Sequence, residues 1–172
     1  MTPARRREIW EAADIVRRGA SVTTPVDVSH LVELLGGSIA VDPTLEAEAK
    51  IERLDEGFRI LLNDEGGKRR QFTLAHELGH LFLHMGYLRD DRLWESSGAF
   101  VDSVYYRQGF GLQEYEANEF AAALLMPAEE FAAVAARYRN SQGFDLRAIS
   151  AEFGVSTEAA LTRGKWLGLF SW

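Results

Sequence analysis

Cysteine is absent from the 172 residues of the chain. Disulfide bonds and cysteine-ligated metal sites are therefore excluded, and a metal ion would have to be held by histidine, aspartate or glutamate. A chain without cysteine also suits a reducing compartment, so we expect a cytoplasmic protein. No apolar run is long enough to span a membrane, and the arginines at 5–7 lead into an amphipathic segment unlike a secretory signal. We expect no membrane partner.

Basic residues are also few. Lysine and arginine number 19 against 26 aspartates and glutamates, which gives a net charge of −7. This balance disfavours broad binding to a phosphate backbone, and we expect no direct nucleic-acid binding. Hydrophobic residues make up 47% of the chain, which is enough to build a core in one domain of this length.

Hydrophobic periodicity and turn residues predict a mostly helical α+β fold with a small three-stranded sheet. The strands are predicted at 38–41, 50–54 and 58–62. Helices are predicted at 4–18, 28–35, 70–85, 114–126, 128–138, 146–153 and 157–167. We expect an N-terminal helix and linker at 1–25, a core at 26–138, and a helix-turn-helix-like subdomain at 139–172 packed on the core.

Residues 76–80 read His-Glu-Leu-Gly-His, the H-E-x-x-H pattern of helical zinc hydrolases. At about 100° per residue, the two histidines fall on one face of the predicted helix, one turn apart. That spacing suits two ligands of one zinc ion. The opposite face is apolar and is predicted to pack on the core: Leu74, Leu78, Leu81, Phe82 and Met85.

Two histidines leave a catalytic zinc site incomplete, because such sites use three protein ligands and keep one open position. His84 continues the histidine stripe. However, side chains at i, i+4 and i+8 are spread over about 12 Å along a helix and do not easily converge on one ion. We therefore expect His84 to pack behind the site and to orient a ligand.

The next helix supplies a better third ligand, Glu114. It shares a stripe with the small residue Ala117, and a carboxylate on a buried stripe needs a partner such as zinc. The alternative is a helix-start carboxylate stabilised by the helix dipole. Asn118, one turn later, is expected to orient a ligand. Glu116 and Glu119 are expected on the solvated face.

These residue types define a mechanism. We expect His76, His80 and Glu114 to hold Zn²⁺ and one water, whose pKa the metal lowers. Glu77 would accept the proton of this water and pass it to the leaving amine. The same set of ligands also accepts Mn²⁺ or Fe²⁺.

Two long segments resemble the ImmA/IrrE family of metallopeptidases. They are residues 72–84, Phe-Thr-Leu-Ala-His-Glu-Leu-Gly-His-Leu-Phe-Leu-His, and residues 114–127, Glu-Tyr-Glu-Ala-Asn-Glu-Phe-Ala-Ala-Ala-Leu-Leu-Met-Pro. A looser resemblance covers most of residues 26–169. It implies a zincin-like, more narrowly gluzincin-like, domain in which the ligands and the base are the residues already named.

The resemblance also implies a biological role. Members of this family are bacterial and phage intracellular proteases that typically cleave a helix-turn-helix transcriptional repressor, and some belong to toxin–antitoxin-like gene pairs. We therefore expect a protein substrate, with such a repressor as the partner. The substrate, the cleaved bond and the oligomeric state are not encoded in any recognisable pattern.

The connection at 86–113 is longer than the resemblance predicts, and is either a lid over the cleft or a surface insertion. It contains Tyr105 and Tyr106, which together with His84 are the candidates for the group that stabilises the transition state. If the predicted strand at 60–62 lies at a sheet edge, an extended substrate could pair with it.

Two other functions compete with the enzyme. The first is a non-catalytic zinc-containing module that binds a repressor or toxin partner, against which the intact Glu77 argues. The second is a DNA-binding regulator that uses residues 146–167. Its basic residues are limited to Arg147, Arg163 and Lys165, so we expect these helices to pack on the protease instead.

Overall fold

A computed structural model describes residues 1–64, 69–101, 111–141 and 143–171 of the chain. Its helices are α1 (Pro3–Gly19), α2 (Val28–Leu34), α3 (Arg70–Leu83), α4 (Asp91–Ser96), α5 (Leu112–Leu125), α6 (Ala128–Arg137), α7 (Leu146–Phe153) and α8 (Thr157–Trp166). Its strands are β1 (Gly37–Val41), β2 (Ala49–Arg53), β3 (Phe58–Leu62), β4 (Ala99–Val101), β5 (Arg139–Asn140) and β6 (Gly143–Phe144).

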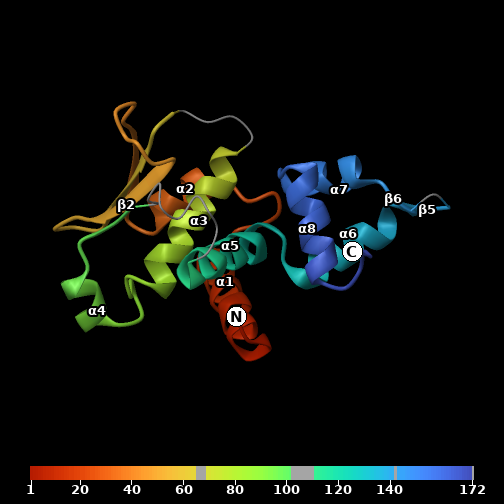
Figure 1. Cartoon of the computed structure of the whole chain (residues 1–172), viewed down its shortest axis with the longest axis horizontal. Helices are drawn as coiled ribbons and strands as arrows, with labels where there is room; N and C mark the ends of the chain where they lie inside the picture. The colour runs from red at the N-terminus through yellow and green to blue at the C-terminus, as the bar shows by residue number, and fades with distance from the viewer. Residues whose placement is uncertain (65–68, 102–110, 142, 172) are drawn as a thin grey trace.

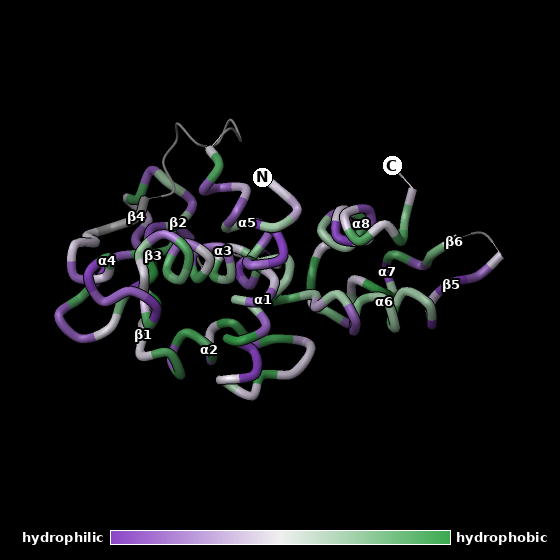
Figure 2. Tube along the Cα trace, turned by 90° about the horizontal axis from the view of Figure 1, so that it is seen from below, coloured by the Kyte–Doolittle hydropathy of each residue, from purple (hydrophilic) through white to green (hydrophobic). Residues whose placement is uncertain are grey.

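The sheet and the last three helices lie at opposite ends of the molecule (Figure 1). The sheet lobe consists of β1 to β4 with α2, α3 and α4, and the helical lobe consists of α6, α7, α8 and the β5–β6 hairpin. Helices α1 and α5 lie between them, and the hydropathy view shows the same arrangement (Figure 2). The predicted α+β fold, with a small sheet before the motif helix, is confirmed.

The sheet has the strand order β1-β3-β2-β4. The three predicted strands form it, and β4, from the long connection, adds a short fourth strand at the edge beside β2. Strand β3 is internal, because Ile60 lies opposite Ile39 of parallel β1 and opposite Ile51 of antiparallel β2. The expectation that β3 could be an edge strand for a substrate is therefore wrong.

Helix α3 packs its apolar face on the sheet and is the centre of the sheet lobe. The predicted core residues Leu74, Leu78 and Leu81 are fully buried, as is Ile60 of the sheet. Burial of each such side chain stabilises the fold by about 2 kcal/mol. The opposite face of α3, which carries the histidines, turns toward α5.

Helix α1 packs along α5. Ile9 and Ala13 of α1 are fully buried. The Arg17 guanidinium donates to the Leu124 carbonyl at 2.7 Å and forms an ion pair with Glu130 at 3.0 Å. This arrangement covers the side of α5 that local sequence pattern assigned to solvent.

The helix-turn-helix-like ending has well-defined helix caps at its turn. Gly154 adopts a left-handed conformation after α7, and the Ser156 hydroxyl accepts a hydrogen bond from the Ala159 amide at the start of α8. Arg163 of α8 is 2% exposed and donates to the Met126 carbonyl at the end of α5. Among the described residues, no helix is both long and apolar enough to cross a membrane.

Candidate metal centre

The site forms where α3 and α5 approach each other at a glycine. A Cβ atom on Gly79 would lie 2.8 Å from the Cα of Ala117 and 3.0 Å from its carbonyl oxygen. Only a residue without a side chain fits there, and Ala117 is itself small. This close contact allows side chains on the two helices to meet.

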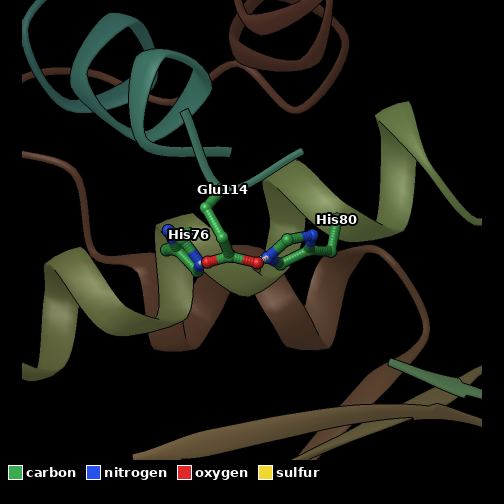
Figure 3. Close-up of side chains that lie close together, drawn as sticks. All are labelled: His76, His80 and Glu114. Carbon is green, nitrogen blue, oxygen red and sulfur yellow. Dashed lines mark hydrogen bonds and ion pairs between the residues drawn. The ribbon is translucent and has the colours of Figure 1, made fainter. Parts of the chain in front are cut away.

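His76 and His80 of α3 meet Glu114 of α5 at one point (Figure 3). The two Nε2 atoms are 3.0 Å apart. One carboxylate oxygen of Glu114 lies 3.2 Å from His76 Nε2, and the other lies 3.4 Å from His80 Nε2. All three residues are buried.

The geometry suits a metal ion. Bonds of 2.0–2.1 Å in a tetrahedral zinc site put neighbouring ligand atoms about 3.3 Å apart. The two histidine nitrogens are 3.0 Å apart, and each Glu114 oxygen lies close to a different one of them, at 3.2 and 3.4 Å, so each of these neighbouring pairs is near that value. Two imidazoles and one carboxylate are also the donors that a hydrolytic metal site uses.

Neighbouring side chains orient both imidazoles. His76 Nδ1 lies 3.0 Å from the Asn118 side-chain oxygen, which can only accept a hydrogen bond. The proton of His76 is therefore on Nδ1, and the lone pair of Nε2 faces Glu114. His80 Nδ1 lies 2.9 Å from His84 Nδ1, so His84 contacts the ring nitrogen that points away from the site.

Glu116 is buried, which corrects the expectation that it lies on the solvated face. Its exposed fraction is 5%. The Arg5 guanidinium of α1 binds it with two hydrogen bonds, of 2.8 and 2.7 Å, and His84 Nε2 lies 3.3 Å from the same carboxylate. The expectation failed because it considered α5 without α1.

Glu119 is buried for the same reason, with an exposed fraction of 8%. The Trp10 indole of α1 donates to it at 2.7 Å. Arg6 and Arg163 lie 3.6 and 3.4 Å away, so α1 and α8 both contribute cations. Each of these arginines also stacks on a tryptophan ring, Arg163 on that of Trp10 and Arg6 on that of Trp166.

The environment sets the charge of the ligands. Burial lowers the pKa of His80 from 6.5 to about 4, so this imidazole is neutral near pH 7. A neutral imidazole beside an ionised carboxylate is the state in which both bind a cation.

Glu77 is fully buried on α3, next in sequence to His76.

The candidates Tyr105 and Tyr106 lie outside the described residues. The described part of the long connection is ordered by local contacts. Asp90 caps α4, and the Trp94 ring packs edge-on against Tyr87 at 4.9 Å between centroids.

We call His76, His80 and Glu114 the metal-binding cluster. A groove of about 740 Å³ opens beside it, between the start of α3, α5 and the α7–α8 corner. We call it the interlobe groove. Its lining includes Asn118, whose side chain contacts His76 of the cluster. Its lining combines apolar residues, among them Phe72, Met126 and Val155, with charged residues, among them Arg69 and Glu158.

Sequence patterns missed the residues that support the site from a distance: Arg5, Arg6, Trp10 and Arg163. One signal was available. Helix α5 carries three acidic residues within two turns and no lysine or arginine, so their partners had to come from other elements. Arg163 was considered a DNA contact, but it is buried against α5.

The family model of the IrrE N-terminal-like domain matches residues 45–165 of the chain. The chain belongs to the ImmA/IrrE family of metallopeptidases. This confirms the resemblance found in the sequence. The matched segment contains the metal-binding cluster but excludes helix α1.

Among solved structures, a Mycobacterium tuberculosis transcriptional regulator has a similar fold. The TM-score is 0.58 at 21% identity, over 91% of this chain and 46% of that one. The likeness supports the fold alone, and the chain spans less than half the length of that regulator. No curated protein matches the chain.

Proposed function

We propose that the protein is a zinc-dependent endopeptidase that cleaves a specific protein partner. The observation that carries this proposal is the convergence of His76, His80 and Glu114, with Glu77 on the same helix, in a chain of a metallopeptidase family. The donor set favours zinc, and Mn²⁺ or Fe²⁺ are the alternatives.

The proposed mechanism assigns each residue one task. When bound, zinc would supply the Lewis-acid chemistry that makes water a nucleophile near neutral pH. Glu77 accepts a proton from that water as its oxygen attacks the scissile carbonyl carbon. It then delivers the proton to the nitrogen as the C–N bond breaks. Asn118 and His84 keep the ligand imidazoles in orientation.

The interlobe groove is the proposed binding site for the substrate chain. It lies beside the metal-binding cluster, with Asn118 in its lining, and is large enough for several residues. The apolar part of its lining favours a segment with large apolar side chains, and the charged residues around it would bind polar groups of that segment. In this proposal α8 forms a wall of the groove, which gives the helix-turn-helix-like ending a role in substrate binding.

We further propose that the substrate is a helix-turn-helix repressor and that cleavage takes place in the cytoplasm. The similar fold belongs to a protein named a transcriptional regulator, which supports a role in transcriptional control. The absence of cysteine suits a reducing compartment.

The test uses as its substrate a helix-turn-helix repressor, chosen from the genes that flank this one. Metal-loaded wild-type protein is expected to cut it into two fragments visible by mass spectrometry. Glu77→Gln should keep the metal and lower the rate at least about 100-fold, because it removes the general base. The exposed Glu33, whose side chain is 74% accessible, provides a matched control, and Glu33→Gln should cleave normally.

A non-catalytic binding module is the second candidate. The two functions differ in one outcome. If Glu77→Gln still relieves repression while the repressor stays full length, the peptidase proposal fails and the binding module remains.

A further inference from the structure

We propose that Arg5 and Glu116 are positioning residues for the metal ligand His80. Helix α1, which carries Arg5, would therefore contribute to the affinity of the site for metal. The inference rests on the proposed role of His80 as a ligand. It extends the site beyond the family segment 45–165, because α1 precedes that segment.

A continuous chain of contacts links α1 to the site. Arg5 Nε lies 2.8 Å from one oxygen of Glu116, and Arg5 Nη2 lies 2.7 Å from the other. The Glu116 carboxylate lies 3.3 Å from His84 Nε2, and His84 Nδ1 lies 2.9 Å from His80 Nδ1. Four side chains on three helices, α1, α5 and the end of α3, thus reach from the surface to the metal-binding cluster.

This series of contacts also determines which imidazole nitrogens carry a proton. Arg5 only donates and the Glu116 carboxylate only accepts, so His84 Nε2 must donate to Glu116. In a neutral imidazole the other nitrogen then accepts, so His84 Nδ1 accepts from His80 Nδ1. His80 Nε2 is therefore left with its lone pair, directed at the cluster. Each contact fixes the donor and acceptor roles in the next one, starting from the ion pair between Arg5 and Glu116.

Because these side chains are buried, water cannot easily replace a contact that is removed. The side chains of His80, His84 and Glu116 are 0, 5 and 7% exposed, so little water can substitute for a missing link. The two-pronged contact from Arg5 holds both carboxylate oxygens and so fixes the plane of the group. A third donor of Arg5 binds the exposed Glu8 and leaves the other two for Glu116.

Helix α1 offers a matched control in Arg17. This arginine joins α1 to the Leu124 carbonyl of α5 and to Glu130 of α6. In the described part of the chain, none of its hydrogen bonds reaches a histidine or Glu116. It is more buried than Arg5, with side chains 7 and 34% exposed. Replacing it should loosen α1 at least as much as replacing Arg5, without breaking the chain to His80.

The experiment measures the dissociation constant for Zn²⁺ on the full, metal-free chain, by competition with a chromogenic chelator. Arg5→Met and Glu116→Gln should each weaken binding by about 10- to 100-fold. The double variant should bind no more weakly than the weaker single variant, because both changes break the same chain. Arg17→Met should lower the unfolding temperature but leave the constant within about twofold of wild type.

The absorption spectrum of bound Co²⁺ reports the coordination directly. It should change in the Arg5→Met and Glu116→Gln variants and stay unchanged in Arg17→Met. Equal loss of affinity in the Arg5 and Arg17 variants would show that α1 is only a scaffold. Normal affinity in both Arg5→Met and Glu116→Gln would also overturn the inference. Failure of the wild type to bind Zn²⁺ would instead overturn the proposed function.

Discussion

The two ligand histidines are each held by a different kind of neighbour. His76 is held directly by Asn118 of α5. His80 is held through His84, which lies one turn further along the chain. Both arrangements leave Nε2 as the acceptor, so the imidazoles are set for a metal before one binds.

The first prediction concerns Asn118. Asn118→Ala removes the oxygen that accepts from His76 Nδ1, so the ring is free to rotate. We expect the affinity for Zn²⁺, measured by chelator competition, to fall about 10- to 100-fold. Asn118→Asp keeps an accepting oxygen and should stay close to wild type. Equal affinity in all three proteins would show that Asn118 does not orient His76.

Much of the candidate site could be predicted from the sequence because the positions of these residues follow from helical spacing. His76, Glu77 and His80 occupy one helix, and Glu114 stands out by its small neighbours. The error at Glu116 and Glu119 has the opposite cause. Their partners Arg5 and Arg6 are more than 100 residues away in sequence, and no local pattern reports which helix covers a given face.

At the scale of elements, the closeness of α3 and α5 depends on Gly79. Helix propensity alone favours alanine over glycine by about 1 kcal/mol. The second prediction is that Gly79→Ala nevertheless destabilises the protein, by about 1–3 kcal/mol, because the new methyl group overlaps Ala117. It should also weaken metal binding by pushing Glu114 away from the histidines.

The control for this prediction is Gly19, the last residue of α1. A Cβ atom there meets no other atom within 4 Å. Gly19→Ala should therefore leave the free energy of unfolding in urea unchanged or raise it slightly. A stable Gly79→Ala variant with normal metal affinity would contradict the close-packing explanation.

The third prediction concerns the sheet and pH. Lys50, and after it Arg59, lower the pKa of Glu52 on β2 below its ordinary value of 4.5. Protons therefore bind this carboxylate more weakly in the folded than in the unfolded state. Its stabilising effect is complete above pH 4.5 and is lost as the pH falls through the lowered folded-state pKa.

Glu52→Gln should accordingly destabilise the protein by about 1 kcal/mol at pH 7, a typical value for an accessible ion pair. The difference from wild type in the free energy of unfolding should shrink as the pH falls below 4.5. A difference that stays constant down to pH 3 would show that the carboxylate does not act through its charge.

Elements with their own periodicity were predicted to within about two residues at each end, as for α3 and β3. The missed elements are short. Helix α4 has six residues, strand β4 has three, and β5 and β6 have two each. Strands of this length depend on the partner beside them, and two or three residues carry no alternation that could be recognised.

At the scale of the whole molecule, Arg163 connects the helical lobe to α5. The fourth prediction is that Arg163→Met lowers the free energy of unfolding by about 3 kcal/mol, because it removes a buried partner of Glu119 and of the Met126 carbonyl. Arg137 pairs with Glu152 on the surface, so Arg137→Met should cost less than about 1 kcal/mol. Similar values for both variants in urea denaturation would contradict this role.

The three buried carboxylates of α5 each require a partner that compensates their negative charge. Glu116 faces Arg5, and Glu119 faces Arg6 and Arg163. Glu114 faces two imidazoles instead, and burial holds His80 neutral near pH 7. The chain thus supplies guanidinium cations for two of its buried anions, and a divalent cation would complete the set. The partner of the third buried anion then depends on occupancy of the metal site, so metal-depleted protein should exchange the amide protons of the first turns of α5 faster than loaded protein does.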